Sequence, residues 1–287
     1  AKITRNKYFV FEVRDLWPEL PRAMGVVTNP FILFGMSVLE YCSYKSADRL
    51  IGLSEGMVEG IVKKGIPKEK VALLPNGSDL NLFETDEIDI SDPIFSGDNF
   101  VAIFTGAHGI ANGLDSVINA ATYLRDAGEN KIQFLFIGDG KCKPDLIKTS
   151  EERKLDNCTF LSPMPKNDLV RYLLNADVGL QSLQNIPAFY KGTSPNKFYD
   201  YIAAGLPVIV NYPGEIADIL QKNNSGIAVT PDNPVEFGKA LITLKKNPLL
   251  LMEMKNNAKK IATEKFNRDL IVKRWVSWVT EEKLNNP

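Results

Sequence analysis

Histidine and cysteine are both scarce in this chain. Its 287 residues contain one histidine, His108, and three widely spaced cysteines that form no Cys-x-x-Cys pair. An odd number of dispersed thiols indicates neither a disulfide framework nor a zinc site, and it fits a reducing cytosol. Chemistry that needs several histidines as acids and bases is also disfavoured, because only one is present.

The chain also lacks a strong charge of either sign and a long apolar run. Its formal net charge is -1, whereas a nucleic-acid-binding protein usually has a basic excess, so we expect no nucleic-acid partner. The most apolar window, residues 31–44, is too short and too interrupted for a membrane span, and no signal peptide precedes it. We therefore expect a cytoplasmic protein.

The first residues resemble the middle of a domain. The chain begins at Ala1 without an initiator methionine and enters an apolar strand at residues 8–13. We therefore expect that an N-terminal part is missing, with a trimmed precursor or an engineered expression product as the alternatives.

The most informative stretch spans residues 192–211, because the start and end of a helix and a following strand are all visible in it. Ser194 is a good N-cap, and Pro195 suits the first helical position. Gly205 supplies a left-handed stop, and residues 207–210 then predict a buried strand.

A helix that begins in a loop of small residues can bind a phosphate or diphosphate. Its first backbone N–H groups are free, and its dipole places partial positive charge there. Lys197 in the first turn is disfavoured by that dipole unless an anion binds in front of it. Asp200, one turn later, could accept hydrogen bonds from sugar hydroxyls. A well-capped helix with a surface lysine is the alternative interpretation of this pattern.

The region before residue 96 contains further strand signals. We expect strands at residues 49–53 and 71–74, a helix at residues 31–45, and an N-cap at Ser54. Arg14 and Asp15 follow the first strand, where open α/β sheets bind ligands, although the two could also pair with each other. The acidic stretch of residues 84–99 predicts a linker between domains.

From residue 100 onward, apolar strands alternate with helical patterns. Continuous apolar strands separated by helices predict a parallel sheet that is covered on both faces, in a Rossmann-like arrangement. The expected strands are residues 100–105, 132–137, 158–161, 177–181, 207–210 and 226–229.

Two of these strands end in glycine-containing loops, at residues 105–109 and 138–140. Neither loop is a Walker loop or a G-x-G-x-x-G fingerprint, so an ordinary phosphate-loop NTPase or dehydrogenase is not expected. Because both loops and the loop at Gly192 come after strand carboxyl ends, we expect all three at one sheet edge.

The tail from residue 233 is helical and rich in lysine. A solvated helix face is the ordinary interpretation, and weak attraction to anionic lipid is the alternative. Trp275 and Trp278 share one helix face, which we expect to dock on a neighbouring domain.

Several motifs occur in a characteristic order along nearly the whole chain. They are residues 11–18, residues 74–79 with Phe83, residues 105–109, residues 137–140 and residues 194–207. Together they resemble GT-B-fold glycosyltransferases of family 4, the retaining, nucleotide-sugar-dependent group. The chain is most similar to bacterial O-antigen and capsule enzymes such as the N-acetyl-L-fucosamine transferases.

The resemblance implies an α/β protein of the GT-B fold with two Rossmann-like domains, of which the N-terminal one is incomplete. Residues 1–95 would form the second half of the acceptor domain plus a linker, residues 96–265 the nucleotide-sugar-binding domain, and residues 266–287 a helix that crosses back. The implied activity is transfer of a sugar to a glycan or polyprenyl-linked acceptor in surface polysaccharide synthesis, with peripheral membrane contact as a further expectation.

The resemblance also implies the site residues. Lys197 and Arg14 would be catalytic, with Lys197 stabilising the leaving diphosphate. No metal or other cofactor is expected, because the chain has no Asp-x-Asp triplet. The implied donor-binding residues are Thr105, Gly106, His108, Gly109, Asn112, Gly138, Gly140, Met164, Gly192, Thr193, Ser194, Asn196, Lys197 and Asp200.

The chain departs from the family pattern at several of these positions. The family's two glutamates, eight positions apart, correspond to Gly192 and Asp200. Its two diphosphate-neutralising cations fall near Ala107 or His108 and on Asn112, and its strand-end histidine corresponds to Arg14. Lys197 is therefore expected to supply the missing positive charge.

Two alternative functions remain open at this point. A sugar-nucleotide 2-epimerase shares the fold and the donor, although it needs more acid and base groups than one histidine provides. A non-catalytic nucleotide-sugar-binding fragment is the second alternative, because the first carboxylate and part of the N-terminal domain are missing.

Overall fold

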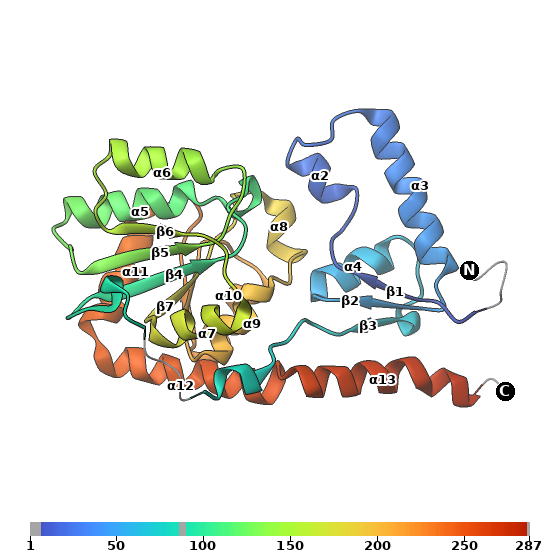
Figure 1. Cartoon of the computed structure of the whole chain (residues 1–287). Helices are drawn as coiled ribbons and strands as arrows, with labels where there is room; N and C mark the ends of the chain where they lie inside the picture. The colour runs from blue at the N-terminus through green and yellow to red at the C-terminus, as the bar shows by residue number, and fades with distance from the viewer. Residues whose placement is uncertain (1–6, 86–89, 286–287) are drawn as a thin grey trace. The chain divides into compact units, whose positions relative to one another are not determined.

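The computed structural model describes residues 7–85 and 90–285, without the side chains of Lys191 and residues 281–285 (Figure 1). The chain divides into two compact units. Unit 1 consists of Ala1–Gly77, Ile186–Pro195 and Arg268–Pro287, and unit 2 consists of Ser78–Asn185 and Asn196–Asn267. Each unit contains its own parallel β-sheet.

Unit 2 is built on a six-stranded parallel sheet with the strand order β6-β5-β4-β7-β8-β9. Its central strands are fully buried, as expected for continuous apolar runs covered on both faces. The predicted strands are therefore confirmed, with differences of at most one residue at an end. Their bounds are β4 (Phe100–Thr105), β5 (Ile132–Ile137), β6 (Cys158–Leu161), β7 (Val178–Gln181), β8 (Val208–Val210) and β9 (Gly226–Ala228).

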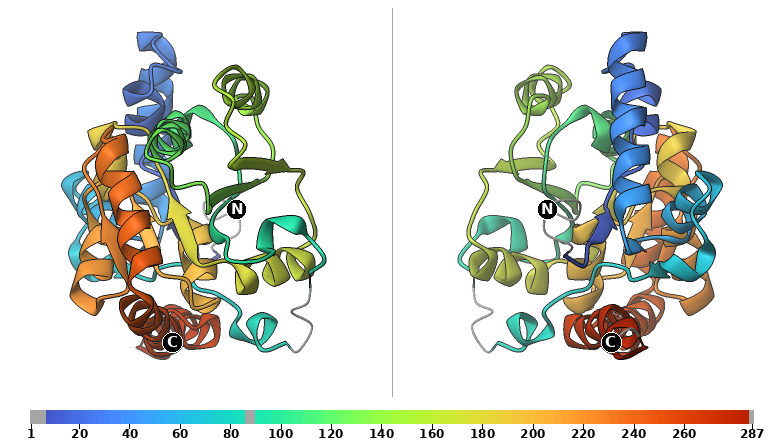
Figure 2. Two further views of the ribbon diagram at one scale, coloured as in Figure 1. Left: turned by 90° about the vertical axis from the view of Figure 1, so that its left-hand side faces the viewer. Right: turned by 90° about the vertical axis from the view of Figure 1, so that its right-hand side faces the viewer.

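Helices cover both faces of this sheet (Figures 1 and 2). In Figure 1, α5 and α6 lie above β4–β6, and α7 and α12 lie below the sheet. Helix α5 also contacts α11, while α9 and α10 pack against α12. The helices are α5 (Asp115–Asp126), α6 (Lys143–Glu152), α7 (Lys166–Asn175), α9 (Asn196–Ala203), α10 (Glu215–Asn223), α11 (Pro234–Lys246) and α12 (Pro248–Lys265), with 3₁₀ turns η2 (Leu80–Phe83), η3 (Pro93–Phe95) and η4 (Ile110–Asn112).

Aromatic rings fill much of the core of unit 2. Phe104, Phe134 and Phe136 come from adjacent strands and are fully buried. Phe136 also stacks on Phe160 with 4.7 Å between ring centroids. Burial of each phenyl ring contributes about 1.5–3 kcal/mol, so the two strands that lead into the glycine loops are firmly anchored.

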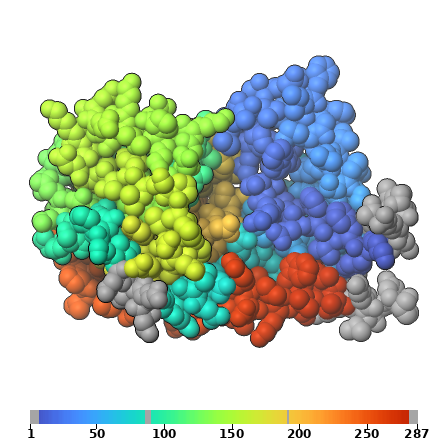
Figure 3. Space-filling model, viewed as in Figure 1, coloured from blue at the N-terminus to red at the C-terminus, as the bar shows by residue number. Residues whose placement is uncertain are grey.

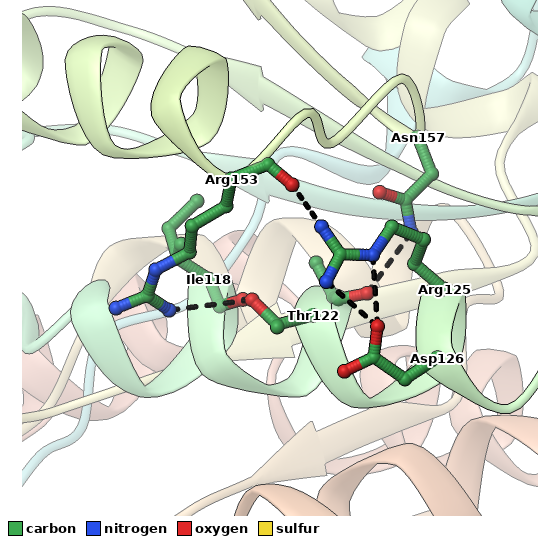
Figure 4. Close-up of polar contacts among 7 residues, drawn as sticks. Ile118, Thr122, Arg125, Asp126, Arg153 and Asn157 are labelled. Atoms are coloured by element: carbon green, nitrogen blue, oxygen red, sulfur yellow. Dashed lines mark hydrogen bonds and ion pairs between the residues drawn. The ribbon is translucent and has the colours of Figure 1, made fainter.

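A polar network fastens α5 to the loop between α6 and β6 (Figure 4). Arg125 donates to the Asp126 carboxylate at 2.6 Å and to the Arg153 carbonyl oxygen. Arg153 in turn donates to the Thr122 hydroxyl at 3.2 Å. Because this loop precedes β6, the network lies at the amino edge of the sheet, opposite the glycine loops.

Part of the lysine charge in the C-terminal helices is neutralised within unit 2. Lys245 and Lys246 both pair with Glu129, at 3.0 and 2.6 Å, and Lys255 pairs with Asp177 at 3.4 Å. These pairs favour the interpretation of an ordinary solvated surface for this side of α11 and α12.

Unit 1 has a three-stranded parallel sheet with the strand order β1-β2-β3. The central strand β2 is completely buried, and Ser54 caps the next helix by accepting a hydrogen bond from the Met57 N–H at 3.1 Å. The cap is confirmed as predicted. The elements are β1 (Val10–Val13), β2 (Arg49–Gly52) and β3 (Val71–Leu73), with helices α2 (Glu19–Ala23), α3 (Pro30–Ser46), α4 (Glu55–Lys63), α8 (Pro187–Lys191) and α13 (Arg268–Asn285) and the 3₁₀ turn η1 (Lys68–Lys70).

Helix α13 is attached to the sheet of unit 1 by a cation–π contact. The guanidinium of Arg49, in β2, lies 3.9 Å from the centre of the Trp278 ring and also donates to the Trp278 carbonyl oxygen. Trp278 is partly buried there, whereas Trp275 remains 39% exposed. Only one of the two tryptophans therefore makes the docking contact that the sequence predicted for both.

Helix α3 belongs to the blue part of the chain in the space-filling view (Figure 3). It carries many exposed apolar side chains. Phe31 and Phe34 are 84% and 71% exposed, which is unusual for large hydrophobic residues. None of the helices that the structure describes is both long enough and apolar enough for a bilayer crossing.

Helix α9 ends in a Schellman motif at Gly205. Gly205 has φ +74° and donates to the Ile202 carbonyl, and Leu206 donates to the Tyr201 carbonyl at 2.9 Å. The predicted stop is confirmed. The start is one residue later than predicted, since Asn196 rather than Pro195 is the first helical residue.

Replacement of Gly205 by alanine should destabilise unit 2 by about 1–2 kcal/mol, because a Cβ atom disfavours the left-handed conformation. The neighbouring Lys259 side chain, 2.6 Å from that Cβ position, can move aside. Gly205→Asn should cost less, since asparagine tolerates this conformation. Urea unfolding followed by circular dichroism measures both, and equal stability of Gly205→Ala and the unaltered chain would contradict the prediction.

Candidate functional site

The loops after β4 and β5 meet at the carboxyl edge of the sheet in unit 2. The Gly106 N–H donates to the Ile137 carbonyl at 2.9 Å, and the His108 N–H donates to the Asp139 carbonyl at 2.8 Å. The two loops therefore continue the parallel pairing of their strands beyond the sheet. Their side-by-side position was predicted from the strand ends.

Gly138 and Gly140 allow this close approach of backbone to backbone. A Cβ atom on Gly138 would lie 1.9 Å from the Gly106 carbonyl oxygen, and one on Gly140 would lie 2.5 Å from the His108 carbonyl oxygen. Both glycines also have positive φ angles. The structure thus gives them a role in loop packing, and their predicted contact with a donor stays a prediction.

Lys197 lies over the β4 loop. Its Nζ donates to the Asn112 Oδ1 at 2.9 Å and lies 3.8 Å from the centre of the Phe104 ring. Its side chain is also the nearest group to Gly106, 3.4 Å from the position of a Cβ atom there. The first turn of α9 therefore brings a cation to the glycine loop, and the structure brings Gly106, Asn112 and Lys197 together as predicted site residues.

Burial lowers the pKa of Lys197 to about 7, because the ammonium loses water and gains no carboxylate in exchange. Within the described residues no ion pair to Lys197 is found. An uncompensated cation of this kind is a typical feature of a site that receives an anion.

Thr105 fixes the position of α9 against the end of β4. Its backbone N–H donates to the Tyr201 hydroxyl at 2.8 Å, and its own hydroxyl lies 3.3 Å from the same oxygen. Burial raises the pKa of Tyr201, so this group stays a neutral phenol. Tyr201 was not among the predicted site residues, because an aromatic residue on a buried helix face resembles ordinary core.

Asp200 is engaged on both carboxylate oxygens. Ser78 donates to Oδ1 at 3.0 Å, and Lys166 pairs with Oδ2. The side chain is only 18% exposed. A sugar hydroxyl that binds to Asp200 would therefore join or replace these partners, and the predicted contact stays a prediction.

His108 is completely buried among the rings of Phe104, Phe136 and Phe160. Burial, and then the nearby positive charge of Lys143, lower its pKa to about 4, so the imidazole is neutral at physiological pH. The ring has no exposed surface, and the structure gives it a packing role. Its predicted hydrogen bond to the donor stays a prediction.

Met164 lies in the loop after β6, beside a pocket of about 370 Å³. Asp168, Arg171 and Tyr172 of α7 also line this pocket. The predicted contact between the Met164 backbone and a nucleobase has space here and remains a prediction. Gly109 has open space around it, and Asn196 is the exposed first residue of α9.

Four predicted site residues belong to unit 1. Gly192, Thr193 and Ser194 follow α8, where Thr193 donates to the Phe189 carbonyl at 3.1 Å and the Ser194 carbonyl accepts from Asn76 at 2.9 Å. Helix α8 was not predicted, and it separates this loop from the end of β7. The prediction that this loop lies at the same sheet edge as the two glycine loops stays a prediction.

Arg14 is the fourth of these residues. Its guanidinium lies 3.8 Å from the Glu12 carboxylate and is 60% exposed, and its charge also attracts the carboxylate of Asp15, the partner that the sequence suggested. Burial raises the pKa of Asp15. Arg14 also lines a pocket of about 410 Å³ between the end of β1 and α3 in unit 1.

The described residues contain no group of three or more histidine, cysteine, aspartate or glutamate side chains that could hold a metal ion. The expectation that no metal or other cofactor is needed stays a prediction.

Comparison with known proteins identifies related sequences. A family model described as "Glycosyl transferases group 1" matches residues 86–261. One relative is WcaI of Escherichia coli, named as a putative colanic acid biosynthesis glycosyl transferase. The two sequences are 23% identical over 253 aligned residues, which cover 84% of this chain and 59% of WcaI. A second relative is the uncharacterized glycosyltransferase MJ1607 of Methanocaldococcus jannaschii. It is 24% identical over 247 aligned residues, which cover 83% of this chain and 61% of MJ1607. The chain thus spans about three fifths of the length of these relatives.

Solved structures of similar fold include HepE and WaaG. HepE of Anabaena, solved in complex with UDP and glucose, has a TM-score of 0.77 and 17% sequence identity to this chain. The superposition covers 100% of this chain and 73% of the HepE chain. WaaG, a glycosyltransferase involved in lipopolysaccharide biosynthesis, has a TM-score of 0.73 and 18% sequence identity to this chain. The superposition covers 92% of this chain and 73% of the WaaG chain. At such identities the likeness shows the fold alone, and it confirms the predicted α/β class of the GT-B type.

Replacement of Gly138 by alanine should separate the two glycine loops, because the new Cβ would overlap the Gly106 carbonyl oxygen. Such overpacking costs about 1–3 kcal/mol, so the thermal unfolding temperature should fall by several degrees. Gly109→Ala is the matched control, since no atom lies within 4 Å of its Cβ position and φ is -108°. Equal melting temperatures for the two variants would show that the loop contact is not tight.

Proposed function

Because the chain belongs to the glycosyl transferases group 1 family, we propose that it is part of a glycosyltransferase and that unit 2 binds the nucleotide-sugar donor. The observation that carries the proposal is Lys197, which lies in the first turn of α9 and has no carboxylate partner among the described residues, at a helix start where backbone N–H groups and the dipole favour an anion. Lys197 packs on the loop at Gly106, 3.4 Å from the position that a Cβ atom would take there, so its amine lies at the end of β4.

Charge stabilisation is the central task of such a site. When the bond between sugar and diphosphate breaks, negative charge grows on the leaving group, and preorganised donors lower the barrier. Lys197 would supply a full positive charge and the helix start a partial one. In the proposed mechanism the transfer is retaining and takes place on one face of the sugar, with the diphosphate helping to accept the acceptor's proton and no metal ion involved.

The donor is proposed to be a nucleoside diphosphate sugar. The solved HepE complexes contain UDP and UDP-glucose, and we extend this chemistry to the present chain as a proposal. The nucleobase would lie at Met164 beside the pocket of α7, and Asp200 would hold the ribose hydroxyls. Family 4 membership and a likeness to N-acetyl-L-fucosamine transferases are parts of the same proposal.

The acceptor is proposed to bind to unit 1. The pocket between β1 and α3 has apolar walls, including Phe11 and Leu39, and carries the charged Arg14 at the strand end. An apolar wall beside polar groups suits a lipid-linked glycan, such as a polyprenyl-linked acceptor. The naming of WcaI for colanic acid biosynthesis supports a role in bacterial surface polysaccharide synthesis, in the cytoplasm and with peripheral membrane contact.

The structure does not favour the 2-epimerase alternative. That reaction needs acid and base groups at the sugar, and the single histidine of the chain is buried in the phenyl cluster.

A thermal-shift screen tests the donor class directly. UDP-, GDP- and dTDP-sugars are added one at a time to the chain, and a ligand that binds only the folded state raises the unfolding temperature. We expect one nucleotide class to stabilise the protein by several degrees. A screen in which none of the three classes produces a shift would contradict the proposed donor site.

Replacement of Lys197 by alanine should lower the turnover of the intact enzyme by a factor of about ten to a thousand, because leaving-group stabilisation is lost. Initial rates of sugar transfer measure the effect. Lys260→Ala, on the exposed face of α12, is the control and should keep normal turnover. Near-normal rates for the Lys197 variant would remove this residue from the mechanism.

Replacement of Asp200 by asparagine should weaken nucleotide binding about tenfold, because charge-assisted hydrogen bonds to the ribose are stronger than neutral ones. Calorimetry with UDP-glucose measures the affinity, and melting temperatures report any loss of the Lys166 pair. Asp218→Asn, exposed on α10, is the matched control. Unchanged affinity in the Asp200 variant would refute the ribose role.

A further inference from the structure

Asn211 extends the pairing of two strands with its side chain. Strands β7 and β8 pair in parallel as far as Gln181 and Val210, and Asn211 is the first residue after β8. The Asn211 Oδ1 accepts from the Leu183 N–H at 2.9 Å, and its Nδ2 donates to the Leu183 carbonyl at 3.1 Å. One side-chain amide therefore satisfies both backbone polar groups of a residue beyond the end of β7.

The amide of Asn211 is fixed in the core of unit 2. The residue is 2% exposed, and its orientation is determined, because a carbonyl can only accept and an N–H can only donate. The Nδ2 also donates to the Ser116 hydroxyl at 3.4 Å, which adds a contact to α5. Since buried polar groups are costly when unpaired, these bonds hold the segment after β7 firmly at this point.

The next residue of that segment, Gln184, holds the turn η4. Its backbone N–H donates to the Ala111 carbonyl at 2.9 Å. Gly113 lies against the same residue, because a Cβ atom there would be 2.7 Å from the Gln184 nitrogen. The three residues of η4 are all at least partly exposed, so its position depends strongly on such backbone contacts.

The turn η4 in turn carries Asn112, which binds the amine of Lys197. The Asn112 Oδ1 accepts from the Lys197 Nζ at 2.9 Å, and its Nδ2 donates to the Ala107 carbonyl at 2.8 Å. The same Nζ lies 3.8 Å from the centre of the Phe104 ring. Because a lysine side chain is long and flexible, the position of its amine depends on contacts near its end.

These contacts form one continuous series within unit 2. It runs from Asn211 through the segment after β7 and the turn η4 to the amine of Lys197. We propose that Asn211 is a positioning residue, which acts through this series to hold the Lys197 amine at the end of β4. Its effect on the donor rests on the proposed donor site, whereas its effect on the amine is a property of the free protein.

Nuclear magnetic resonance of the free protein tests the series. Lysines are labelled with ¹³C at Cε, and the Lys197 signal is assigned by its loss in Lys197→Arg. The Phe104 ring shifts upfield the proton signals of groups held over its face, so the Lys197 protons should resonate upfield of those of exposed lysines. Asn211→Ala should move them toward the exposed position. An ordinary signal in the unaltered chain, or one that Asn211→Ala does not move, would overturn the inference.

Calorimetry with UDP-glucose tests whether the series acts on the donor. Asn112→Ala and Asn211→Ala should each weaken binding about tenfold, because each releases the same charged group. The double variant should bind about as weakly as either single variant, since residues that act through one another are not additive. Losses that multiply to about a hundredfold in the double variant would overturn the inference.

Asn157→Ala controls for a general loss of stability. Asn157 is another buried asparagine of unit 2, 6% exposed, and its Nδ2 donates to the Ala121 carbonyl at 3.3 Å. It precedes β6 at the amino edge of the sheet. This variant should unfold at a lower temperature but keep the Lys197 signal and the affinity for UDP-glucose. Equal changes in both readouts would trace them to stability alone and overturn the inference.

Gly113→Ala breaks the series at a second point and serves if Asn211→Ala does not fold. The new Cβ would overlap the Gln184 nitrogen and push η4 away, so the Lys197 signal should move in the same direction. A signal that stays in place would overturn the inference. Failure of every nucleotide sugar to bind the unaltered chain would count against the proposed function, while the Lys197 signal would still test the series.

Discussion

The candidate site depends on one contact between two backbones. The β4 and β5 loops can run side by side only because Gly138 has no side chain to strike the Gly106 carbonyl oxygen. That contact leaves the space above Gly106 to the side chain of Lys197, which reaches it from α9. Thr105 and Tyr201 then hold the helix against the end of β4. The position of the Lys197 amine is therefore set by packing. Its chemistry depends on the absence of a carboxylate partner among the described residues.

The candidate site differs from the resembled family in which positions carry charge. Gly192 stands where the resembled family has a glutamate, and Asn112 stands where it has a cation. The two changes remove charges of opposite sign, and they leave Lys197 with a neutral neighbour. We infer that the protein balances its diphosphate with one lysine and the N–H groups of a helix start, with much less support from fixed charges than a pair of cations would give.

Local patterns in the sequence predicted most of the fold but only part of the site. Some features depend on only a few adjacent residues and could therefore be predicted. They are the strands of unit 2, the Ser54 cap and the Gly205 stop. The hydrogen bond between Asn112 and Lys197 joins segments 85 residues apart in the chain, which no local sequence pattern predicts. The burial of His108 has the same cause, because its phenyl neighbours come from three different strands. Helix α8 was missed because it is short and lies among loop-forming residues.

The strand order of unit 2 has a consequence for how such a site could change. Strands β4 and β7 are neighbours at the centre of the sheet. The strands that follow β4 in the chain, β5 and β6, extend the sheet on one side, and those that follow β7, β8 and β9, extend it on the other. Connections that leave adjacent strands in opposite directions open a crevice at their carboxyl ends, whatever side chains are present. The winding of the chain thus predicts where a ligand binds, and we propose that residues such as Asn112 and Lys197 select it. Substitutions there could alter the ligand without any change of topology.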